Sequence, residues 1–116
     1  MDQNPQHTPV TYTYFQPVTP YDLSVLDMDA SLVKFMRCME SHAERALPGQ
    51  TRMYYKIQHP SDDVVSLTMT FYGATDLEAF TAYMSAHFYA TMQASTTWLV
   101  RRPNFPPQGD EIQANG

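Results

Sequence analysis

The sequence predicts an α+β fold in which two helices cover one face of a small antiparallel sheet. Two successive patterns between residues 51 and 93 carry this prediction. The first is an alternation of apolar and polar residues, the period of a strand with one buried face, and its apolar positions are Val65, Leu67, Met69 and Phe71. The second is an apolar residue at every third or fourth position, the spacing of a helix that packs one stripe on a sheet, at Leu77, Phe80, Met84, Phe88 and Met92.

The N-terminal part of the chain is expected to hold the first strand. Residues 1–9 are polar and predict a flexible N-terminus, whereas residues 10–16 are dense in Thr, Tyr and Phe and favour a strand. Two prolines, Pro17 and Pro20, then interrupt this pattern. Residues 21–28 are compatible with a strand extension, a helical turn or a packed loop.

A first long helix is predicted to begin at a cap formed by Asp29 or Ser31 and to run to about Leu47. Pro48 and Gly49 end it. Charged and polar residues cover one side of this helix, and the other side carries an apolar arc of Leu32, Phe35, Met36, Met39, Ala43, Ala46 and Leu47.

The C-terminal half is expected to add three strands and a second helix. Residues 52–58 and 65–72 form the second and third strands, joined by the turn signal of residues 59–63. The second helix is capped by Thr75 or Asp76. Residues 95–101, which include Trp98, predict a final strand, and the Pro-rich residues 103–116 are expected to form a tail without packed structure.

The resulting order, βαββαβ, is that of the ferredoxin-like fold, with a four-stranded antiparallel sheet and two helices on one face, and the domain spans residues 10–102. The second face of such a sheet is left bare. Its residues would be Thr11, Thr13, Phe15, Tyr54, Ser66, Thr68 and Thr70. Because this surface is amphipathic, we expect it to pack on a second copy, which gives a homodimeric α+β barrel.

Composition excludes several classes of function. With a net charge of −5 and only seven Lys plus Arg among 116 residues, the chain is not expected to bind nucleic acid. The single cysteine, Cys38, and four dispersed histidines predict neither disulfides nor a zinc site, and we expect no metal. No apolar run is long enough for a membrane span, and the N-terminus lacks signal-peptide features. The sequence therefore predicts a soluble, cytoplasmic protein of one domain.

Helix geometry suggests a ligand site. Tyr83 and His87 are four residues apart and share one helix edge, as do Cys38 and His42 on the first helix. If these edges converge, they form an apolar pocket with a few titratable groups, completed by Phe35, Tyr55, Phe71, Phe80 and Trp98. In that pocket His87 could accept a proton, Tyr83 or Tyr72 could donate a hydrogen bond, and Arg101 could bind a carboxylate at the mouth.

Less specific interpretations of the same residues apply as well. A histidine beside an apolar stripe is more often a core-edge residue bonded to the backbone than a catalytic group, and Cys38 carries no signature of a reactive thiolate. Trp98 is more often packing than ligand contact, and Arg101 with Arg102 could simply protect a strand end.

The order of residues around the second helix adds a family resemblance. An aromatic residue ends the strand, an acidic residue follows in the turn, and the helix continues with a characteristic run: Tyr72, Asp76, Ala79-Phe80, Tyr83 and Ser85-Ala86-His87-Phe88. This order resembles the antibiotic-biosynthesis-monooxygenase-like domains of the dimeric α+β barrel superfamily, many of which have a His where this chain has Tyr83. The resemblance in element order extends over residues 10–102.

The resemblance implies oxidation or rearrangement of a small aromatic or polyketide-like compound, as in secondary metabolism, often with no metal or flavin. Heme-degrading members of this fold use an Asn on the first strand, a Trp at the end of the third and a His late in the second helix. Here residues 10–16 contain no Asn, Tyr72 replaces the Trp, and residues 89–93 contain no His. Heme oxygenation is therefore disfavoured.

Residues and resemblance together predict a small cofactor-independent monooxygenase-like or cyclase-like enzyme that binds an aromatic molecule between sheet and helices and works as a homodimer. Two alternatives stay open. One is a non-catalytic dimeric ligand-binding or assembly module, in which Phe35, Phe80 and Trp98 fill the pocket completely. The other is an isomerase or lyase that uses the same His and Tyr.

Overall fold

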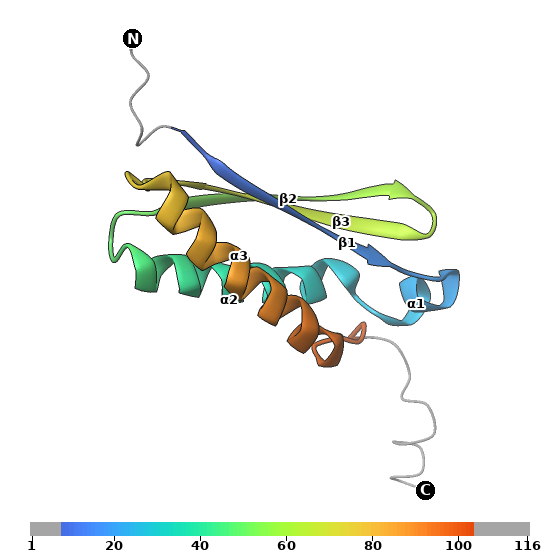
Figure 1. Ribbon diagram of the computed structural model, residues 1–116. Helices are drawn as coiled ribbons and strands as arrows, with labels where there is room; N and C mark the ends of the chain where they lie inside the picture. Colours follow the sequence, from blue (N-terminus) through green and yellow to red (C-terminus); the bar gives the residue numbers. More distant parts are fainter. Residues whose placement is uncertain (1–7, 104–116) are drawn as a thin grey trace, which may run out of the picture.

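The structure, a computed structural model, describes residues 8–103, so most of the predicted N-terminal segment and nearly all of the predicted tail lie outside the described residues. The chain folds as an α+β protein, which confirms the predicted class (Figure 1). Its elements are β1 (Val10–Pro17), α1 (Pro20–Val25), α2 (Met28–Ala46), β2 (Arg52–Ser61), β3 (Val64–Tyr72), α3 (Leu77–Ala94) and the short 3-10 helix η2 (Ser95–Thr97).

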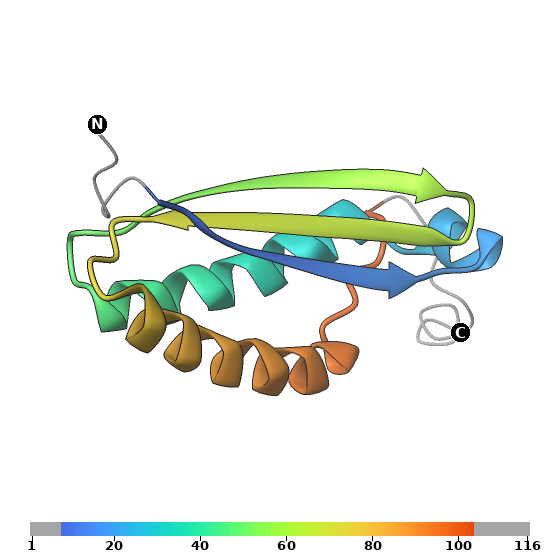
Figure 2. The same cartoon turned by 45° about the horizontal axis from the view of Figure 1, so that its top comes forward.

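The three strands form one antiparallel sheet in the order β1-β3-β2. The long helices α2 and α3 lie side by side on one face of this sheet, and no helix covers the other face in the described part of the chain (Figures 1 and 2). The predicted two-layer arrangement of two helices on a sheet is therefore confirmed.

Strand register places the apolar alternation on the helix side. Tyr14 on β1 is opposite Leu67 on β3, and Ile57 on β2 is opposite the same residue. The β3 side chains on this side are almost completely buried: Val65, Leu67, Met69 and Phe71. They pack against the apolar arc of α2 and against Phe80 and Met84 of α3, and burial of this apolar surface holds the two layers together.

The prediction of a fourth strand at residues 95–101 is wrong. Residues 95–97 form η2, and the following segment pairs only through an isolated bridge between Leu26 and Arg101. The Asp27 amide donates to the Val100 carbonyl at 2.7 Å, and the Arg102 amide donates to the Val25 carbonyl at 3.0 Å. The segment thus satisfies its backbone groups on the α1–α2 connection, and no strand of the described residues occupies the outer edge of β1.

Helix α1 explains why this connection is available as a partner. Thr19 caps it by accepting from the Asp22 amide at 3.0 Å, while the Asp22 carboxylate accepts from the Thr19 amide at 2.8 Å. Pro20 occupies the start of the helix, where its missing N–H costs nothing. Of the three possibilities for residues 21–28, the structure therefore shows a helical turn followed by an extended connection.

The start of α2 also differs from the prediction. Asp27, and not Asp29 or Ser31, is the cap, because its carboxylate accepts from the Ala30 amide at 3.0 Å. Ser31 has another role: its buried hydroxyl accepts from the Val100 amide at 2.8 Å and so binds the C-terminal segment to α2. Of the two caps predicted for α3, Thr75 and Asp76, the structure shows Asp76.

The uncovered face of the sheet carries the residues expected there. Two large aromatic side chains stand out on it, since Phe15 and Tyr54 are 60% and 57% exposed. Threonines separate them, and Thr13 and Thr68 lie within hydrogen-bond distance of one another at 3.3 Å. No helix in residues 8–103 is long and apolar enough to cross a membrane.

Candidate functional site

The two predicted helix edges meet at the contact between α2 and α3. The rings of His42 and His87 stack with centroids 3.9 Å apart and an interplanar angle of 19°. The ring of Tyr83 meets His87 edge-on at 4.5 Å and 62°. Cys38 completes the group, because its Sγ lies 3.8 Å from His42 Nε2. We call Cys38, His42, Tyr83 and His87 the histidine seam.

Neighbouring side chains determine which nitrogen of His42 carries the proton. Arg45 Nη1 lies 3.3 Å from His42 Nδ1, and a guanidinium can only donate, so Nδ1 must be the acceptor. The neutral ring therefore carries its hydrogen on Nε2, which faces the sulfur of Cys38. Cys38 Sγ also lies 3.8 Å from the hydroxyl of Thr91, a buried residue of α3.

The same surroundings lower the pKa of His42 below its usual value. Partial burial is the largest cause, because it disfavours the charged imidazolium. The facing ring of His87 and the guanidinium of Arg45 lower the pKa further by charge repulsion. His42 is therefore held neutral near pH 7.

A hollow of about 330 Å³ adjoins the histidine seam. It lies between the C-terminal end of α2, the β3–α3 turn and the first turns of α3, and its volume is within the range of small-molecule sites. We call it the Phe80 pocket, and its lining residues are Arg45, Ala46, Leu47, Ala74, Thr75, Asp76, Ala79, Phe80 and Tyr83. Tyr83 belongs both to this pocket and to the histidine seam.

The walls of the Phe80 pocket differ in character. Phe80 and Ala74 are almost fully buried and present an apolar surface, while Arg45 and Asp76 are exposed. Asp76 caps α3 by accepting from the Ala79 amide at 3.1 Å. The pocket therefore combines an apolar interior with charged groups of both signs at its rim.

Two glycine turns adjoin the helix ends that line this pocket. Gly73, with φ +115°, allows β3 to turn sharply into α3, and a Cβ at this position would overlap the Gln50 carbonyl oxygen. After α2, the Gly49 amide donates to the Glu44 carboxylate at 2.8 Å, which closes the end of that helix.

Other predicted site residues lie away from the Phe80 pocket. Phe35 is fully buried and stacks on Tyr14 at 4.5 Å, and the hollow beside it measures only about 10 Å³. Phe71 is buried below Phe80, with ring centroids 6.2 Å apart. Trp98 caps η2, and Arg101 lies in the bridge to Leu26, so neither lines the pocket.

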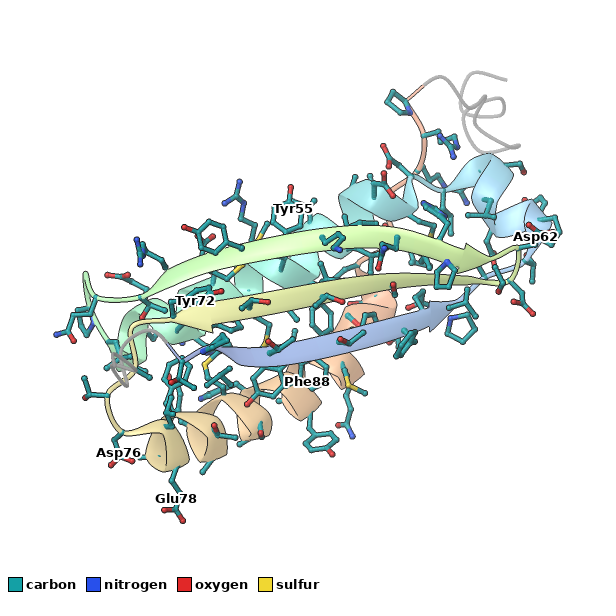
Figure 3. The ribbon with its side chains drawn as sticks, turned by 90° about the horizontal axis from the view of Figure 1, so that it is seen from above. Tyr55, Asp62, Tyr72, Asp76, Glu78 and Phe88 are labelled. Carbon is teal, nitrogen blue, oxygen red and sulfur yellow. The ribbon has the colours of Figure 1, made fainter. Side chains whose placement is uncertain are left out.

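Tyr72 and Tyr55 both lie away from the histidine seam, Tyr72 on the other side of the sheet and Tyr55 at the exposed edge strand β2. Strand alternation places Tyr72, labelled in Figure 3, on the uncovered face. Its ring meets that of Tyr54 there, with centroids 5.7 Å apart. Tyr55 lies on the edge strand β2, is 48% exposed, and borders a shallow hollow of about 190 Å³ with Tyr54 and Lys56. The structure therefore brings together Cys38, His42, Tyr83, His87 and Phe80, but not these two tyrosines.

Sequence reasoning missed the charged rim of the pocket. A signal for Arg45 was present, because it follows His42 by three residues and so shares its helix face. Asp76 was recognised only as a cap. Within the described part of the chain no cluster of three His, Cys, Asp or Glu side chains could hold a metal ion.

Comparisons with known proteins found no relative: no family model, no curated protein and no solved structure matches this chain.

Proposed function

We propose that the protein is a small proton-transfer enzyme that binds an aromatic or polyketide-type molecule in the Phe80 pocket. The observation that carries this proposal is that Tyr83 belongs to both the Phe80 pocket and the histidine seam. Its side chain lines an apolar hollow of ligand size, and its ring contacts His87, which stacks on the neutral His42.

His87 is the proton acceptor in this proposal. Among the described residues, neither the His87 ring nor the Tyr83 hydroxyl has a hydrogen-bond partner. A histidine that served only as a core-edge residue would be expected to bond to the backbone. Tyr83 lines the Phe80 pocket directly, and His87 lies beside the pocket through its ring contact with Tyr83. His87 removes a proton from a phenol or from carbon next to a carbonyl, and Tyr83 donates to the phenolate or enolate oxygen that forms.

Several reactions share this first step. The electron-rich anion can react with molecular oxygen without a cofactor, as in the proposed monooxygenase. One oxygen atom then becomes a carbonyl oxygen of the product, and the other leaves as water with electrons and protons that the substrate supplies. Alternatively, the anion can attack an internal carbonyl, as in a cyclase. Reprotonation at another carbon makes the enzyme an isomerase. The family resemblance favours the first two, and all three depend on the same pocket.

The test measures binding, product formation and oxygen uptake with hydroxylated naphthalenes and anthrones. We compare the native protein with His87→Ala and with His59→Ala, a matched variant on β2 that leaves the histidine seam intact. Saturable oxygen uptake that falls at least about tenfold only in His87→Ala supports the oxygenase. Product without oxygen uptake supports the cyclase or isomerase. If nothing binds, the enzyme proposal fails.

The uncovered sheet face supports a second candidate, a homodimeric binding or assembly module. Phe15 and Tyr54 are large, exposed and on the same face, and no strand within residues 8–103 occupies the outer edge of β1. A second copy packed on this face would remove both aromatic side chains from water. A homodimer is compatible with either function. The cytoplasmic location stays a prediction.

A further inference from the structure

Arg45 differs from Arg37 and Arg102 in its polar contacts. Arg37 forms an ion pair with Glu40 at 3.1 Å, and Arg102 donates twice to the Leu23 carbonyl at 3.1 and 2.8 Å. The Arg45 guanidinium instead donates to the neutral nitrogen Nδ1 of His42 and has no carboxylate partner among the described residues. At the edge of the Phe80 pocket its charge therefore has no direct ion pair.

The acidic groups near this edge already accept backbone N–H donors. Asp76 accepts from the Ala79 amide, and Glu44 accepts from the Gly49 amide. The positive end of the α3 dipole further offsets the Asp76 charge. A guanidinium has five N–H donors in a planar fork, so after its bond to His42 Arg45 keeps donors for a planar anion such as a carboxylate.

We propose that Arg45 is the anion-recognition residue of the Phe80 pocket and that the ligand is therefore an aromatic acid. The carboxylate pairs with Arg45 at the rim, and the aromatic body lies against the apolar surface of Phe80 and Ala74. This inference rests on the proposed function, because it requires that the Phe80 pocket binds a ligand.

The contact between Arg45 and His42 also orients such a ligand. Arg45 and Tyr83 both line the pocket, and Tyr83 also belongs to the histidine seam. An acid whose carboxylate is held by Arg45 therefore places its ring substituents toward the histidine seam. A hydroxyl beside the carboxylate would then be the group that meets Tyr83 and His87. A hydroxylated aromatic acid of about two fused rings suits the apolar volume of such a site.

The test compares a hydroxynaphthoate with the matching neutral hydroxynaphthamide by isothermal titration calorimetry. The native protein is expected to bind the acid about tenfold more tightly than the amide, because a charge-assisted pair is lost in the amide. Arg45→Gln is expected to remove this preference by weakening only the acid. Arg45→Lys keeps the charge but not the planar fork, and should retain part of the preference.

Two further variants make the result decisive. Arg37→Gln removes a different exposed arginine from α2 and should leave both affinities unchanged. Ala79→Trp fills the pocket and should abolish binding of both compounds; acid binding that survives it takes place elsewhere and overturns the inference. Equal affinities for acid and amide, unchanged in Arg45→Gln, overturn the anion inference but leave the proposed function standing. If neither compound binds the native protein, the proposed function fails as well.

Discussion

At the scale of single residues, the stacked imidazoles of His42 and His87 make the contact between α2 and α3 sensitive to protons. Both rings cannot easily be charged at a centroid distance of 3.9 Å, and Arg45 adds a third positive group on the same side. The other groups facing His42 are Cys38 and, across the seam, Tyr83 through its contact with His87. None of these side chains is a carboxylate that could pair with an imidazolium.

This arrangement predicts how stability depends on pH. Because the pKa of His42 is lower in the folded protein than the usual value of about 6.5, the unfolded chain binds more protons below that pH. The contribution of His42 to the free energy of unfolding is therefore complete above about pH 6.5 and decreases as the pH falls through the window below it. His42→Gln should remove this decrease.

Urea denaturation at a series of pH values measures the effect. His59→Gln is the control, because His59 lies on β2 beside Asp29 and away from the seam, and it should leave the His42 contribution in place. A pH profile for His42→Gln that coincides with that of the native protein would contradict the interpretation.

At the scale of elements, the turn between β3 and α3 decides where the Phe80 pocket forms. Gly73 has a positive φ and lies against the Gln50 carbonyl, so the turn ties the start of α3 to the chain that leaves α2. The two helix ends that form the pocket walls are thereby held at one separation.

Gly73→Ala should therefore destabilise the protein by at least about 2 kcal/mol, because the new Cβ meets backbone at a φ that L-residues avoid. Gly49→Ala is the matched comparison: its φ is +73°, but no atom lies within 4 Å of a Cβ there, so only about 1 kcal/mol of backbone strain is expected. Equilibrium urea unfolding of both variants gives the two values. Equal losses in the free energy of unfolding for the two variants would show that the contact with Gln50 is unimportant.

Another element-scale feature is the course of the C-terminal segment. Residues 98–102 have the composition of a strand, yet they pair with the connection between α1 and α2 and with the hydroxyl of Ser31. The local sequence favours extended backbone, and the segment does form one isolated β-bridge, between Arg101 and Leu26. The choice of partner depended on contacts 69 residues away in the chain, which no local pattern encodes.

At the scale of the whole molecule, one face of the sheet is uncovered by any helix of residues 8–103. The sheet buries its helix-facing side chains almost completely, while Phe15 and Tyr54 on the other side stay mainly in contact with solvent. Exposed aromatic side chains on a flat sheet face favour association with another surface.

We expect the protein to be a homodimer through this face. Sedimentation equilibrium should give a dimer for the native protein and a monomer for the double variant Phe15→Glu and Tyr54→Glu, because the carboxylates would be buried without partners. Tyr89→Glu is the control, since Tyr89 is 65% exposed on α3, away from the sheet face. A native monomer, or a double variant that remains dimeric, would exclude this interface.

Local sequence patterns by themselves determined the two-layer α+β class, the approximate bounds of three strands and two long helices, and the pairs Cys38–His42 and Tyr83–His87 on shared helix edges. These follow from the periods of helices and strands, which act over a few residues. Only the tertiary structure decided that the two pairs meet, that the ligand-sized space opens at Phe80 and not at Phe35, and that Arg45 lies at its rim. It also placed Tyr72 on the opposite side of the sheet and paired the backbone of the C-terminal segment with the α1–α2 connection. These outcomes depend on how helices cross and which distant backbone groups pair, and such contacts form between residues that local periodicity does not connect.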